Sequence, residues 1–176
     1  QWIGSASCRR ESALRFKPIH ALSFSVGFLS LSQEILWFRF VGFTLQGAPQ
    51  AFAFTLAFFL LGIAAGAIAG RRLCEAHDER TLLGRLAGVF LVGAALDVAL
   101  PFICAAMFVA ADAGDPLLKM LALAGTGFSV ALTAGLKGTA FPIVHHLGTR
   151  QGDVNLGRSV SLTYFSNILG SAIAPL

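Results

Sequence analysis

Ionisable side chains lie inside the long apolar stretches of this sequence, where charge is unusual. Glu34 and Asp97 each occupy the middle of an apolar run. A charged side chain in hydrocarbon costs about 2.5–3.5 kcal/mol on insertion scales, so such a group needs partners and often marks a functional site. The candidate intramembrane polar site predicted on this basis consists of Glu34, Arg39, Asp97, Lys137 and Asn167.

Asp97 has a second feature, because Pro101 follows it by four residues. Proline cannot donate a hydrogen bond to the carbonyl four residues earlier, so the backbone carbonyl of Asp97 is released beside its own carboxylate. A kink of this kind can bind a cation or a proton, and it can equally be a structural kink of the sort that membrane helices tolerate. Arg39 and Lys137 lie nearer the ends of their runs, where the alternative is that their side chains reach the membrane interface.

Motifs of soluble enzymes do not occur in this sequence. It has no nucleophile elbow, no phosphate-binding loop of the Walker type and no dinucleotide-binding fingerprint. The cysteines Cys8, Cys74 and Cys104 lack the spacing of a metal site or a disulfide framework. The basic residues are spread between apolar blocks, which argues against nucleic acid as a partner. We therefore expect no catalytic residue, metal or cofactor in this sequence.

The elements that must position the polar residues follow from composition. Of the 176 residues, 56% are hydrophobic and 12% are charged, against about 25% charged in ordinary soluble domains. Lipid must therefore solvate part of the chain, and a span needs about 20 mostly apolar residues. We predict an all-α, polytopic transmembrane helix bundle of about five spans: 20–43, 51–70, 86–111, 117–136, and a last span that begins near 160 and is truncated at 176. The stretch 137–159, which contains Pro142, is expected to be a helix end followed by a loop.

The basic residues predict an orientation. Three groups are separated from one another by two spans each: Arg9, Arg10, Arg15 and Lys17; Arg71, Arg72, Arg80 and Arg85; and Lys137, Arg150 and Arg158. The opposite side has Lys119 alone. Because cytoplasmic loops are enriched in Lys and Arg, we expect a multi-pass protein of the cell inner membrane with a cytoplasmic N-terminus. Residues 1–18 are then a basic cytoplasmic segment, and residues 19–176 are a transmembrane domain that is incomplete at its C-terminus.

Small and polar residues recur at helical spacing within the spans. Gly62, Gly66 and Gly70 fall on one helix face, and such a face allows close backbone approach and helix packing. Polar and small stripes occur in three other spans: Ser23, Gly27, Ser30 and Glu34; Gly125, Ser129, Thr133 and Lys137; and Thr163, Asn167, Gly170 and Ala174. We expect these stripes to face the bundle interior, where they either hold helices together or line a polar pathway.

Three segments resemble a bacterial family of membrane proteins in which a helical domain precedes a spermidine synthase-like domain. Segment 33–39 is similar to the E-x-L-W-x-R signature of the family's first span, and segment 58–62 with the glycines after it is also similar. Segment 138–142 is similar to its G-x-x-F-P segment, and segment 164–170 to its Y-x-x-N-x-x-G segment. The resemblance covers about residues 20–176.

The resemblance implies an integral membrane domain that anchors a cytosolic aminopropyltransferase-like domain and handles its substrate. That soluble domain lies outside this sequence, so aminopropyl transfer is expected of the full-length family protein and not of this segment. Two alternatives stay open: a segment of a transporter or channel for a cation or polyamine, and a structural membrane subunit. The expected partners are the lipid bilayer, the C-terminal soluble domain, and a polyamine or cation.

Overall fold

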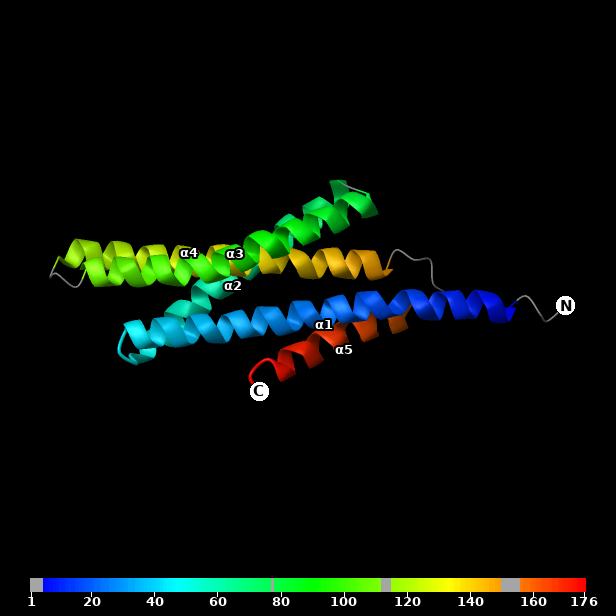
Figure 1. Cartoon of the computed structure of the whole chain (residues 1–176), viewed down its shortest axis with the longest axis horizontal. Coiled ribbons are helices and arrows are strands. Elements are labelled where there is room, and N and C mark those ends of the chain that lie inside the picture. Colours follow the sequence, from blue (N-terminus) through cyan, green and yellow to red (C-terminus); the bar gives the residue numbers. More distant parts are fainter. Residues whose placement is uncertain (1–4, 77, 112–114, 150–155) are drawn as a thin grey trace. The chain divides into compact units, whose positions relative to one another are not determined.

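The structure, a computed structural model, describes residues 5–76, 78–111, 115–149 and 156–176. It consists of five helices: α1 (Ser5–Thr44), α2 (Pro49–Ala76), α3 (Glu79–Ala111), α4 (Pro116–Thr149) and α5 (Leu156–Ile173) (Figure 1). No strand occurs among the described residues. The predicted all-α class is confirmed.

Four helices are long and apolar enough to cross a membrane. These segments are Ile19–Thr44, Pro49–Ala76, Arg80–Ala111 and Pro116–Gly148, and the shorter Val160–Ile173 is also apolar. Large apolar side chains on α3, such as Leu91, Phe102 and Val109, are more than 70% exposed. Lipid is the solvent that suits such a surface, because a water-soluble protein rarely exposes apolar patches of this extent. The prediction of about five helical spans is thus confirmed.

The expected loop at 137–159 is wrong at both ends, because 137–149 belong to α4 and 156–159 to α5, while 150–155 lie outside the described residues. Helix α4 continues through Pro142 and ends at Thr149. A proline inside a membrane helix is tolerated when neighbouring groups satisfy the backbone atoms it releases. Here the carbonyl of Pro142 itself accepts a weak bond from the Cys74 thiol of α2, with a sulfur–oxygen distance of 3.8 Å. At the position where the local sequence predicts the end of the helix, α4 packs against α2.

A tight turn reverses the chain between α1 and α2. Gln46 and Gly47 have positive φ values of 53° and 73°. The N–H of Gly47 donates to the carbonyl of Gly42 at 2.7 Å, and that of Gln46 to Phe43 at 3.2 Å, the pair of bonds of a Schellman cap. The rings of Phe38 and Phe52 then stack across the hairpin, 4.9 Å apart. Helices α1 and α2 therefore run antiparallel.

The chain forms two compact units: residues 1–31 with 144–176, and residues 32–143. In the first unit, α5 packs along α1 in parallel. Ser23 Oγ donates to the carbonyl of Thr163 at 2.7 Å, and Ser171 Oγ donates to the carbonyl of Gly27 at 3.2 Å. A Cβ on Gly27 would collide with the backbone of Asn167, so the absence of a side chain is what allows this approach.

In the second unit, the three glycines predicted to share a face lie against the backbone of α4. A Cβ on Gly62 would collide with Ala131, one on Gly66 with Gly135, and one on Gly70 would stand 2.7 Å from the carbonyl oxygen of Thr139. The partner numbers rise together along both helices, so α2 and α4 run parallel. Because the part of α1 in this unit is antiparallel to α2, it is antiparallel to α4 as well.

Candidate functional site

An ion pair between α3 and α4 is the centre of the candidate site. Lys137 Nζ lies 2.5 Å from Asp97 Oδ2, and the two side chains are 9% and 22% exposed. Both helices are apolar enough to span a membrane. In such surroundings each charge needs the other, because an unpaired buried ion is far more costly than the pair.

A hydrogen-bonded group lies one helical turn away on α4. The indole Nε1 of Trp37 donates to Thr133 Oγ1 at 3.2 Å. Thr133 Oγ1 in turn lies 2.9 Å from the carbonyl oxygen of Ser129 and 3.2 Å from that of Val130, so its single proton is shared between them. Trp37 is 2% exposed and Thr133 fully buried. This contact fixes how α1 faces α4.

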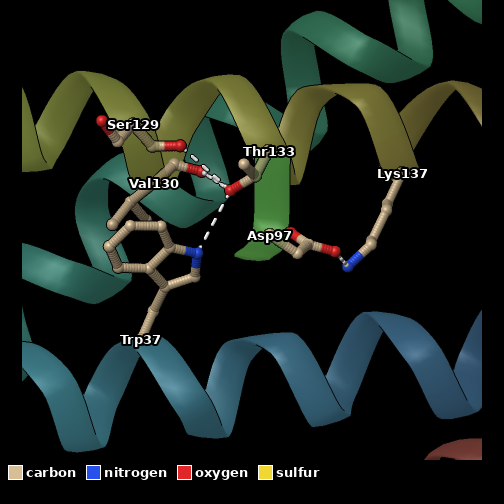
Figure 2. Close-up of polar contacts among 6 residues, drawn as sticks. All are labelled: Trp37, Asp97, Ser129, Val130, Thr133 and Lys137. Carbon is tan, nitrogen blue, oxygen red and sulfur yellow. Dashed lines mark hydrogen bonds and ion pairs between the residues drawn. The ribbon is translucent and has the colours of Figure 1, made fainter. Parts of the chain in front are cut away.

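The position of Gln33 follows from that contact. Gln33 precedes Trp37 by one turn on the same face of α1, and Lys137 follows Thr133 by one turn on α4. Because the two helices are antiparallel, Gln33 and Lys137 lie at the same level, each about 6 Å along its helix from the Trp37–Thr133 bond. Figure 2 shows the Asp97 carboxylate and the Lys137 amine meeting between α4 and α1. The buried side chain of Gln33 therefore lies on the α4-facing side of α1, at the level of the ion pair.

Polar atoms around the ion pair are only partly satisfied. Gln33 is 3% exposed, and neither its Oε1 nor its Nε2 has a hydrogen-bond partner among the described residues. Asp97 Oδ1 is buried and likewise has no partner there. Buried polar atoms are nearly always hydrogen-bonded in native proteins. These three atoms are thus available to a ligand that both donates and accepts hydrogen bonds.

Of the residues predicted for the site, Asp97 and Lys137 come together, while Glu34 and Arg39 do not join them. Glu34 is half-buried and Arg39 is exposed. No ion pair joins either residue to the described part of the chain. The buried face of α1 contains Gln33 and Trp37. Gln33 is the residue next to Glu34, the carboxylate that the sequence predicts to be buried.

Asn167 belongs to the other unit of the chain. It is half-buried on α5, and its backbone lies against Gly27. Its Oδ1 is buried and has no hydrogen-bond partner among the described residues. In that unit Gly170 also meets the backbone of α1, at Phe24. Asn167 thus occupies a helix contact within its own unit.

Sequence reasoning missed Gln33, Trp37 and Thr133 as a group. Gln33 and Trp37 lie within segment 33–39, and Thr133 lies in one of the polar stripes. The signal that could have found them is a spacing of four residues, from Gln33 to Trp37 on α1 and from Thr133 to Lys137 on α4. This spacing puts each pair on one helix face. Among the described residues, no group of three or more His, Cys, Asp or Glu is placed to hold a metal ion.

Comparison of the chain with protein-family models, with curated proteins and with solved structures gives no match.

Proposed function

We propose that this chain is the membrane domain of a spermidine synthase-like membrane protein, where it anchors a cytosolic aminopropyltransferase-like domain and handles its substrate. The observation that carries the proposal is that all three motif segments lie at helix contacts. Trp37 of the first segment bonds to α4, Gly138 of the second lies against Ile63 of α2, and Gly170 of the third lies against α1. Residues that build such contacts are those a shared fold requires.

The gene beyond Leu176 tests this proposal directly. We expect it to encode a soluble domain with a glycine-rich nucleotide-binding loop and acidic residues. Membranes that contain the full-length protein should then transfer an aminopropyl group from decarboxylated S-adenosylmethionine to a polyamine acceptor. A gene that encodes further membrane spans and no soluble domain would contradict the proposal.

The proposed location is the bacterial inner membrane, with the N-terminus in the cytoplasm. The distribution of Lys and Arg supports this orientation. Single cysteines at Gln50 and Ala76, two exposed positions at opposite ends of α2, test it in a variant whose native cysteines are replaced. A membrane-impermeant thiol reagent added to intact cells should label the cysteine at Gln50 and spare that at Ala76. The reverse labelling pattern would overturn the orientation.

The Asp97–Lys137 pair also suits a second function, transport of a cation or polyamine, in which the transported charge would take the place of the Lys137 ammonium on the Asp97 carboxylate. An ion pair inside membrane helices is a common element of ion and substrate pathways. Uptake of radiolabelled spermidine into vesicles tests this function in the wild type and in Asp97→Asn, with Glu75→Gln, an exposed site, as the control. Uptake that falls in Asp97→Asn alone, compared at equal amounts of folded protein, supports transport. Equal uptake in all three proteins argues for an anchoring or structural role.

A further inference from the structure

The Gln33 side chain is the buried polar group of the second unit that the described structure leaves least satisfied. Gln33 is only 3% exposed, and its amide oxygen and nitrogen both lack hydrogen-bond partners among the described residues. An amide can accept through its oxygen and donate twice through its nitrogen. Burial of such a group without partners costs roughly as much as a stabilising hydrogen bond provides, or more.

The neighbouring carboxylate has complementary capacity. Lys137 occupies Asp97 Oδ2, while Asp97 Oδ1 is buried and has no partner in the described part of the chain. The register between α1 and α4 places Gln33 at this level. Two acceptor oxygens and one donor nitrogen without partners among the described residues are therefore buried at the same level of the second unit.

Charge decides which class of ligand fits there. Asp97 and Lys137 together are neutral, so the site already has the counter-ion that a buried carboxylate requires. A further cation would stand beside the Lys137 ammonium without compensation, and a further anion beside the carboxylate. An uncharged group that donates to Asp97 Oδ1 and accepts from Gln33 Nε2 avoids both penalties.

We propose that Gln33 and Asp97 form a binding site for an uncharged group that both donates and accepts hydrogen bonds. Water has this chemistry, and so does the primary amide or hydroxyl of a small solute. The Lys137 ammonium holds the carboxylate in place and keeps the site neutral. This site depends on the second unit alone and not on the spermidine synthase-like relation, so the two proposals fail separately.

The sign of a stability change provides the first test. Gln33→Met keeps an unbranched side chain of similar length and removes both polar atoms. If the amide is bound to a ligand, the variant loses that interaction, and its thermal unfolding midpoint in lipid nanodiscs falls by at least about 2 °C. If the amide is simply buried without a partner, the variant relieves that cost and the midpoint rises, which would overturn the proposal. Gln50→Met, at an exposed position, is the matched control and should leave the midpoint unchanged.

Solid-state NMR in lipid bilayers identifies the ligand directly. The protein is labelled with nitrogen-15 in its glutamine side chains, and the Gln33 signal is assigned by its loss in Gln33→Met. A rapid transfer of magnetisation from water protons to Gln33 Nε2, insensitive to added acetamide, identifies a resident water. A shift of that signal on titration with acetamide, with Gln50 unaffected, identifies a solute site. Slow transfer from water together with no response to acetamide would refute the site.

Discussion

Removal of one partner of the Asp97–Lys137 pair should be among the most destabilising single changes in the second unit. The two side chains are 22% and 9% exposed and lie 2.5 Å apart. Breaking a buried pair leaves one uncompensated charge and typically costs about 3–5 kcal/mol. The partial exposure of Asp97 favours the lower end, so we expect Lys137→Met to lose about 3 kcal/mol. That loss lowers the ratio of folded to unfolded protein by about 100-fold.

A double-mutant cycle separates the interaction energy of Asp97 with Lys137 from the effect of changing each residue alone. Asp97→Asn together with Lys137→Met removes both charges, and the double variant should recover much of the stability that Lys137→Met loses. Unfolding by SDS titration in mixed micelles, followed by tryptophan fluorescence, measures all four proteins. The coupling term is then the difference between the double variant and the sum of the single changes.

The exposed pair Arg71–Glu75 provides the matched control. Its atoms lie 2.9 Å apart, within one helix, and its side chains are 80% and 61% exposed. Solvent screens such a pair, so Arg71→Met should leave stability unchanged within error. If Lys137→Met is no more destabilising than Arg71→Met, or if the double variant is as unstable as the single, the claim that the Asp97 carboxylate depends on Lys137 is wrong.

Three further changes test the packing around this pair. Gly66→Ala places a methyl group against the backbone of Gly135 and should destabilise by about 1–3 kcal/mol in the same titration, whereas Gly88→Ala, which meets nothing within 4 Å, should be neutral or stabilising. Trp37→Phe keeps an aromatic ring but removes the bond to α4 and part of the buried indole, so it should lose about 1–3 kcal/mol and leave helix content by circular dichroism unchanged. Combined with Gly66→Ala, Lys137→Met should show additive losses to within about 0.5 kcal/mol, because the two changes affect different faces of α4.

Much of the fold could be predicted from local sequence. The apolar runs located the spans, and a spacing of four placed Gly62, Gly66 and Gly70 on one face because helical periodicity depends only on neighbouring residues. The continuation of α4 beyond Pro142 could not be predicted in this way. That continuation is accompanied by packing between α2 and α4, which brings Cys74 close to a carbonyl 68 residues away.

The charged residues of the candidate site could be predicted from local sequence, but their pairing could not, because it depends on contacts between distant helices. Asp97 and Lys137 were both recognisable as charges in apolar surroundings, but their pairing links residues 40 apart and depends on the register of two helices. Glu34 drew attention because it is charged, whereas the burial of α1 follows Gln33 and Trp37. A shift of one residue turns a helix by about 100°, so a stripe of polar residues cannot by itself decide which of two neighbours faces inward.

One face of α4 packs against α2 through small residues, and the opposite face has the polar side chains of the candidate site. Ala131, Gly135 and Thr139 lie against the glycines of α2, and such small-residue contacts hold membrane helices together without charge. Adhesion of α4 to α2 therefore does not require the polar groups Thr133 and Lys137 on its other side. Buried charge is costly in lipid whether or not it is paired. Thr133 and Lys137 instead join α4 to α1 and α3, and the ligand that we propose would offset part of the cost of their burial by bonding to the Gln33 and Asp97 atoms that have no partner among the described residues.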